Sequence, residues 1–124
     1  MQRNELLAYV VGAAVAGSVL VLPYMVRPLV AFVVPGFAVV HVPFFLLPVV
    51  WGLWNHLYVR VAPPLDIGVW GGVLGLVLAT AVNAFLYTQG TWFTAALALL
   101  VLLPVVYLLL WRFIVGSLNT ALGV

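Results

Sequence analysis

The sequence predicts an all-α integral membrane protein, a kinked bundle of four transmembrane helices forming a single domain over 1–124. The first observation is composition: of 124 residues, 68% are hydrophobic and 5% are charged. Soluble domains are about 25% charged, and a small soluble domain could not bury so much apolar surface. The second observation is length, because a membrane-spanning helix needs about 20 mostly apolar residues and the chain has room for four.

Polar or proline-containing segments separate the predicted spans. The spans cover about 5–26, 37–59, 67–87 and 92–113. In the first span, Asn4 suits the N-cap position, and Glu5 suits the first turn, where an acidic side chain interacts favourably with the helix dipole. The pair Arg27–Pro28 follows the predicted end of this span.

The segment between the first two spans is unusually apolar for a connection. A helix continuing from 28 to 60 would extend about 50 Å, which exceeds the ~30 Å hydrocarbon core of a bilayer. We therefore expect a break at Pro35–Gly36 and a short interfacial or tilted helix at 28–34. The second span carries Pro43 and Pro48, so it should be kinked.

The last two spans have clearer boundaries. The loop RVAPPLD at 60–66 precedes the third span, and the turn TQGT at 88–91 separates it from the fourth, which contains Pro104. The tail after the fourth span is mildly amphipathic. It therefore either lies at the membrane surface or extends the last helix.

The arginines predict the orientation. With four spans, Arg3, Arg60 and Arg112 fall on one side of the membrane and Arg27 falls on the other. The positive-inside rule then favours both termini in the cytoplasm. We expect a multi-pass protein of a prokaryotic inner membrane.

Small residues mark the faces on which the helices should pack, because helices in lipid associate through close backbone approach. In the first and third spans these residues recur at steps of three or four, which keeps them on one face of a helix. They are Ala8, Gly12 and Ala16 in the first span, and Gly68, Gly72, Gly75 and Ala79 in the third. One interpretation is that these two spans pack against each other. The other is that one face forms a homo-oligomer or docks on a partner subunit.

Both histidines fall in the second span, at different depths. His41 lies near the outer boundary, level with Asn83 of the third span, with Thr80 one turn deeper. A hydrogen bond between helices explains His41 and Asn83, and a polar site for an ion, a quinone or another ligand is the alternative.

The other histidine, His56, lies near the inner surface beside Asn55, on or at the edge of the polar face of the helix. Either it reaches towards water, or it ligates haem or a metal. The two histidines are about 22 Å apart along a helix, so one chain cannot hold one iron with both.

The absence of charged residues from the middle of the spans, and of cysteine from the chain, argues against several classes of function. No charged side chain lies in the middle of a span, where proton-coupled carriers and voltage sensors usually need one. The chain has no cysteine, a formal net charge of +2, and no catalytic or metal-ligand pattern. We therefore expect no enzyme activity, no metal, no cofactor and no nucleic-acid binding.

The leading hypothesis is a non-catalytic protein that acts by helix packing. Its partners would be the lipid bilayer and either other membrane subunits or copies of itself. The alternatives are a passive channel or small-solute transporter with a polar site near His41 and Asn83, and a subunit that anchors haem or quinone.

Overall fold

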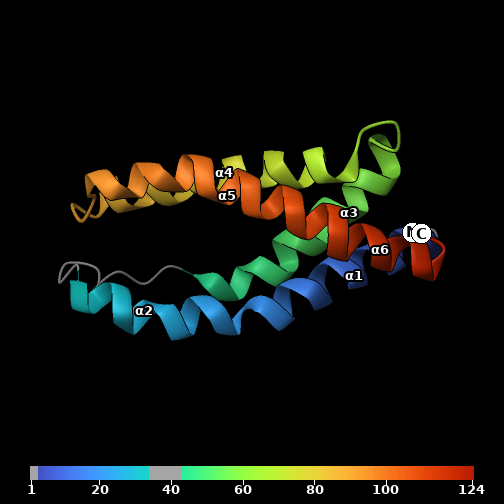
Figure 1. Cartoon of the computed structure of the whole chain (residues 1–124). Coiled ribbons are helices and arrows are strands. Elements are labelled where there is room, and N and C mark those ends of the chain that lie inside the picture. Colours follow the sequence, from blue (N-terminus) through green and yellow to red (C-terminus); the bar gives the residue numbers. More distant parts are fainter. Residues whose placement is uncertain (1–2, 34–42) are drawn as a thin grey trace.

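The computed structural model describes residues 3–33 and 43–124, and within these residues every regular element is a helix and none is a strand (Figure 1). The elements are α1 (Arg3–Val19), α2 (Val21–Val33), the 3₁₀ helix η2 (Phe44–Leu46), α3 (Leu47–Val61), α4 (Ile67–Thr88), the 3₁₀ helix η3 (Thr94–Ala98), α5 (Leu99–Leu110), the π-helical turn η4 (Trp111–Val115) and α6 (Gly116–Leu122). The predicted all-helical class is confirmed.

Three helical stretches of the described residues are long and apolar enough to cross a membrane. They are Arg3–Val33, Ile67–Thr88 and Thr94–Leu122. The second predicted span begins outside the described residues, as does the predicted break at Pro35–Gly36. Its described part consists of η2 and α3, with Pro48 in the first turn of α3. A proline is accommodated there because the first turn has no intrahelical partner for its N–H.

The first helical stretch is longer than predicted. Residues 28–33 are helical, but they continue α2 without interruption, so the separate short helix predicted at 28–34 is wrong. The interruption lies at Leu20 instead, between α1 and α2. Proline at position 23 explains it, because a proline ring clashes with the carbonyl four residues earlier, here that of Val19.

The fourth predicted span also extends further than expected. Its helix begins at Thr94 and runs through η4 into α6, so the tail extends the last helix rather than separating from it. Pro104 lies inside α5. The preceding long helix, α4, begins after Asp66, whose Oδ1 accepts a hydrogen bond of 3.1 Å from the backbone N–H of Val69. This cap fixes the start of the helix.

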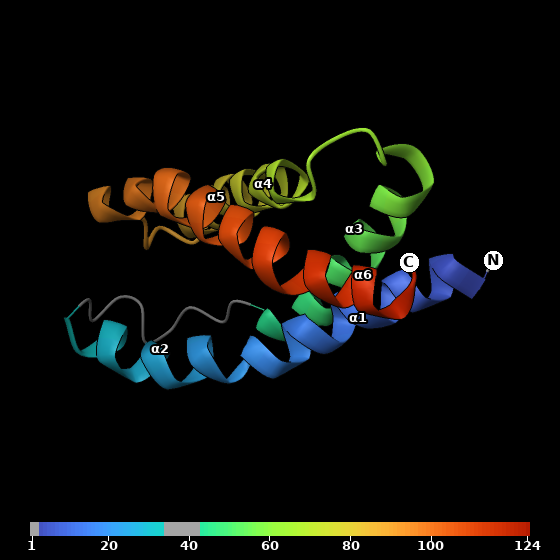
Figure 2. The same cartoon turned by 45° about the vertical axis from the view of Figure 1, so that its right-hand side comes forward.

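The helices pack as two antiparallel hairpins, α1 with α3 and α4 with α5 (Figures 1 and 2). The prediction that the first and third spans pack against each other is therefore wrong. The predicted small-residue faces of α1 and α4 each lie against the hairpin partner, with Gly12 on α3 and Gly75 on α5. The short connection between Thr88 and Thr94 favours the pairing of α4 with α5, because consecutive elements are usually neighbours in space.

Among the described residues, the two hairpins meet at one end of the molecule, which we call the closed end. There α1 packs against η4 and α6, and the start of α1 lies close to α6 (Figure 1). Side chains of α3 reach the same two elements, Trp51 beside Trp111 and Asn55 bonded to Asn119. At the opposite end no residue of α2 is buried, and its ribbon diverges from those of α4 and α5 (Figure 2).

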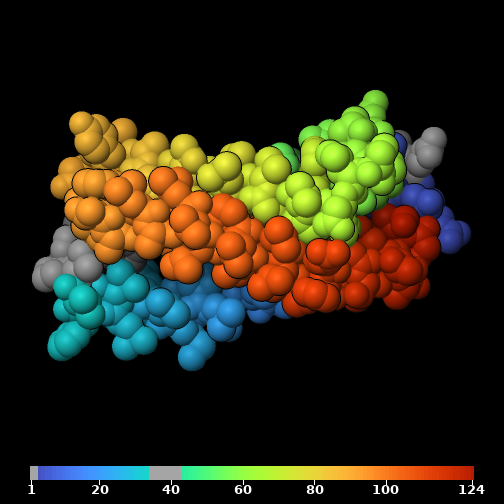
Figure 3. All heavy atoms as spheres, turned by 45° about the horizontal axis from the view of Figure 1, so that its top comes forward, coloured from blue at the N-terminus to red at the C-terminus, as the bar shows by residue number. Residues whose placement is uncertain are grey.

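The outer surface is strongly apolar. Phe32 is 89% exposed and Val101 is 68% exposed. Figure 3 shows α5 and α6 as a continuous ridge along the length of the molecule, and the outward side chains of α5 are valines and leucines. Such a surface suits contact with hydrocarbon.

Candidate functional site

The face between α1 and α3 depends on two glycines that oppose each other. A Cβ added to Gly12 would collide with the backbone carbonyl of Trp51, and one added to Gly52 would lie 2.9 Å from the carbonyl oxygen of Tyr9. On the same face of α1, Ala8 and Ala16 are completely buried. These helices can therefore approach closely only because both backbones are bare at the crossing.

The face between α4 and α5 is built in the same way. A Cβ on Gly75 would lie 2.6 Å from the carbonyl oxygen of Leu103, and one on Gly68 would lie 3.1 Å from that of Leu108. At Gly72 the nearest such atom is 3.5 Å away, which is an ordinary contact. Ala79 is completely buried further along α4.

Sequence reasoning missed one glycine on this helix. Gly71 lies directly against the indole ring of Trp111, which is itself fully buried. The spacing rule selected Gly72 from the adjacent pair, because it fits the steps of the stripe. Nothing local in the sequence indicates that a ring forty residues later requires the other glycine.

A buried amide pair joins the hairpins at the closed end. Asn55 of α3 and Asn119 of α6 donate to each other's Oδ1 through Nδ2, at 2.9 Å in both directions. The second N–H of the Asn55 amide donates to the carbonyl oxygen of Ala8 at 2.8 Å. Asn55 is completely buried and Asn119 is 5% exposed. The amide of Asn55 is thus bonded within the bundle, as a buried polar group should be.

Two tryptophans connect α3 to α4 by a reciprocal contact. Each indole N–H donates to the other residue's backbone carbonyl at 3.0 Å, Trp54 to Trp70 and Trp70 to Trp54. Their rings stack with centroids 4.6 Å apart and planes 25° from parallel. Stacking and hydrogen bonding therefore hold the same pair of residues.

A second aromatic group fills the closed end. Trp51 donates its indole N–H to the hydroxyl oxygen of Tyr107 at 3.1 Å, and the two rings meet edge to face. Trp111 lies beside Trp51 with centroids 6.1 Å apart. The Nε1 of Trp111 is buried and has no hydrogen-bond partner among the described residues.

Of the residues predicted to form an outer polar site, the structure describes Asn83 and Thr80. His41 lies outside the described residues. The amide of Asn83 donates to the carbonyl oxygens of Ala79 and Ala96 at 3.0 Å, and its Oδ1 accepts from the indole of Trp92. These bonds fasten the α4–η3 turn.

Thr80 and His56 are also placed by local contacts. Thr80 is exposed, and its hydroxyl donates to the carbonyl oxygen of Leu76 on its own helix. His56 is half-buried, with Nδ1 3.4 Å from the backbone oxygen of Glu5. Within 3–33 and 43–124, no three histidine, cysteine or acidic residues come together as they would around a metal.

A second small-residue face of α1 is exposed. Ala14, Gly17 and Ser18 are exposed, on the side of the helix away from α3. A Cβ added to Gly17 would have no described atom within 4 Å, in contrast to Gly12 on the opposite face. The hydroxyl of Ser18 donates to the carbonyl oxygen of Ala14 at 2.9 Å, so this face is also free of unpaired hydroxyl donors.

Comparison with known proteins adds no relative: no family model matches the chain, and no curated protein or solved structure matches it.

Proposed function

We propose that this chain is a small integral membrane protein that acts by helix packing, without catalysis, in an assembly with copies of itself or with other membrane subunits. The apolar outer surface and the three long apolar helices support a place in the bilayer. The polar side chains between the helices support a packing role, since Asn55, Asn83 and Trp54 each bond to a neighbouring segment of the chain.

The observation that carries the proposal is the exposed glycine in α1. Glycine inside a helix is less favourable than alanine by roughly 0.5–1 kcal/mol. Gly12 and Gly75 offset this cost through close helix contacts within the chain. Gly17 makes no such contact. In lipid, a small residue on an outer face allows a second helix to approach, so we assign this face, Ala14–Gly17–Ser18, to an intermolecular contact.

The proposed topology has four crossings, with α3 as the second. The first residues of α1 and the whole of α6 lie at the same end of the molecule (Figure 1). An even number of crossings is required if the two ends of the chain emerge on one side. Arg3, Arg60 and Arg112 all belong to helix turns of this end, which supports a cytoplasmic location for both termini.

The test is the mass of the protein extracted in mild detergent, with and without the substitution Gly17→Leu. We expect the unmodified chain in particles that contain more than one 13.4 kDa subunit. Gly17→Leu should release monomers while the folded chain keeps its stability, because the substitution meets open space and improves helix propensity.

The matched control is Val10→Leu, at a residue on the same helix that is 51% exposed. This variant should keep the assembly. If the unmodified chain is monomeric in native mass spectrometry, the proposal is contradicted. It is also contradicted if the Gly17→Leu variant still forms the assembly.

A further inference from the structure

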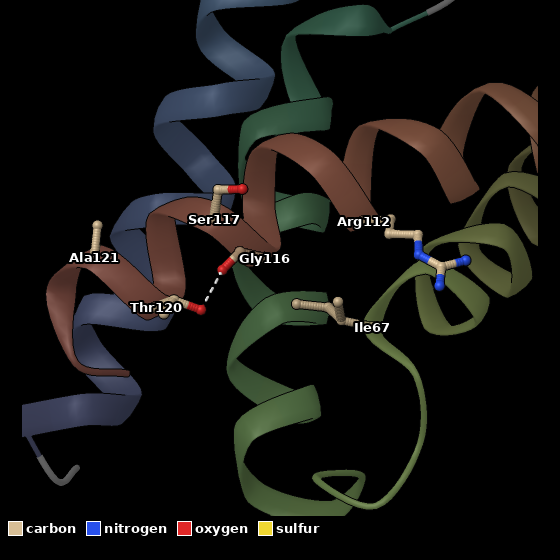
Figure 4. A pocket seen from close by; sticks show the side chains of 6 residues that line it. All are labelled: Ile67, Arg112, Gly116, Ser117, Thr120 and Ala121. Carbon is tan, nitrogen blue, oxygen red and sulfur yellow. Dashed lines mark hydrogen bonds between the residues drawn. The ribbon is translucent and has the colours of Figure 1, made fainter.

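An open groove lies at the closed end, between the start of α4 and the side of α6 (Figure 4). Its volume is about 520 Å³. The residues that line it are Ile67, Arg112, Gly116, Ser117, Thr120 and Ala121. In the close-up, Ile67 lies between Thr120 on one side and Arg112 on the other (Figure 4). The groove thus has an apolar floor, a cationic edge and a hydroxyl-bearing edge.

Its depth in the proposed membrane follows from helix lengths. The 22 residues of α4 extend about 33 Å, close to the ~30 Å thickness of the hydrocarbon core. Ile67, the first residue of α4, therefore lies where hydrocarbon meets the lipid headgroups. The seven residues of α6 project about 10 Å further. The corner between them lies at headgroup level.

The arginine at this corner has unused bonding capacity. Its side chain is 57% exposed, and its nearest anionic partner among the described residues is Asp66, at 3.9 Å. That distance is too long for a hydrogen bond, and the other oxygen of Asp66 already caps α4. A guanidinium group has five N–H donors in a planar fork that fits a phosphate.

The hydroxyl edge offers acceptors rather than donors. Thr120 donates to the carbonyl oxygen of Gly116 at 2.9 Å, and Ser117 donates to that of Phe113 at 2.7 Å. Each hydroxyl oxygen keeps lone pairs that can accept a hydrogen bond. A ligand for this groove should therefore combine an anionic phosphate with hydroxyl donors and an apolar segment.

From this arrangement we infer that the groove binds the headgroup of an anionic glycerophospholipid. The phosphate binds Arg112, a hydroxyl of a glycerol headgroup donates to Thr120, and the first methylenes of an acyl chain pack on Ile67. The inference rests on the proposed membrane location, but it does not depend on the assembly through Gly17.

The experiment compares phosphatidylglycerol with phosphatidylcholine of the same acyl chains, each added to the detergent-solubilised full chain. Phosphatidylglycerol should raise the melting temperature by several degrees more than phosphatidylcholine and should give more lipid adducts in native mass spectrometry. Arg112→Gln should remove this difference, and Thr120→Val should reduce it. Arg60→Gln, at another exposed arginine of the closed end, should preserve it.

Each other outcome overturns the inference. An equal loss in Arg60→Gln and Arg112→Gln would indicate diffuse attraction of anionic lipid rather than a site. An equal stabilisation by inorganic phosphate would indicate a site for a free anion. A change of particle mass in Arg112→Gln would indicate that a second copy occupies the groove. A chain that stays dispersed and folded without detergent would contradict the membrane location itself, which separates that failure from a failure of the lipid site.

Discussion

At the residue scale, the closed end depends on side chains whose polar atoms are bonded in a dry environment. A buried polar group without a partner costs about 1–3 kcal/mol. The amides of Asn55 and Asn119 avoid this cost by bonding to each other. Their reciprocal geometry also fixes the relative position of α3 and α6, because neither amide can shift without losing two bonds at once.

The two buried tryptophans of this end differ in one respect, which gives a prediction. Trp51 and Trp111 are 1% and 0% exposed, but within 3–33 and 43–124 only the indole N–H of Trp51 has a partner. Replacing either by phenylalanine removes the same atoms, so the cavity contributions should be similar. Trp51→Phe also removes the hydrogen bond to Tyr107. It should therefore destabilise the protein by about 1 kcal/mol more than Trp111→Phe.

The measurement is unfolding in mixed micelles as the SDS fraction is raised, followed by circular dichroism for both variants. Equal free energies of unfolding would show that the bond between Trp51 and Tyr107 adds nothing to stability. A larger loss for Trp111→Phe would show that packing against Gly71 outweighs the hydrogen bond.

At the element scale, helix pairing depends on which glycines lie under a neighbouring backbone. Gly72 and Gly75 are three residues apart on α4, yet an added Cβ would lie 3.5 Å from the nearest atom at the first and 2.6 Å at the second. Gly75→Ala should therefore destabilise the α4–α5 hairpin by roughly 1–3 kcal/mol through overpacking. Gly72→Ala should be neutral or stabilising by up to about 1 kcal/mol, because alanine is the better helix former.

The same SDS titration, applied to these two variants, checks this prediction. Both variants change a glycine of α4 to alanine, so they differ mainly in the space around the added methyl group. Equal stability of the two variants would contradict the close approach of α4 to Leu103 and Pro104.

The sequence indicated which residues face another helix more reliably than it indicated which helix they face. Composition was enough for the helical class, and the i, i+4 spacing selected Gly12 and Gly75, which lie at close crossings. Spacing within one helix carries no information about its partner, so the pairing of the first and third spans was wrong. Asn119 was overlooked for a related reason, since its partner Asn55 is 64 residues away.

The π-helical turn η4 was also beyond sequence reasoning. The buried residues of the last helix recur every fourth position, at Tyr107, Trp111, Val115 and Asn119. On a straight α-helix such a stripe rotates by about 40° at each step. A π turn holds more residues per turn, so η4 slows this rotation and keeps Val115 and Asn119 directed at α1 and α3. The requirement comes from the partner helices, and no local motif encodes it.

At the scale of the whole molecule, the described parts of the two hairpins are joined at the closed end. The contacts of Trp51, Asn55 and Trp54 with the second hairpin all lie towards the closed end. At the opposite end α2 has no buried residue, and the amide of Asn83 bonds to Ala96 within the α4–α5 hairpin. The relative position of the described parts of the hairpins is therefore set by one compact group of aromatic and amide side chains, while α2 keeps an exposed apolar surface.

This arrangement makes the topology testable, because the chain has no cysteine of its own. Single cysteines at Asn4, at Leu122 and at Gln89 in the turn after α4 are all at exposed positions. With four crossings, a membrane-impermeant thiol reagent should label the first two from the same side of sealed vesicles. It should label the Gln89→Cys variant from the opposite side. Labelling of positions 4 and 122 from opposite sides would mean an odd number of crossings, in which α3 stays at the surface, and the positive charges of Arg3 and Arg112 would then no longer share one face of the membrane.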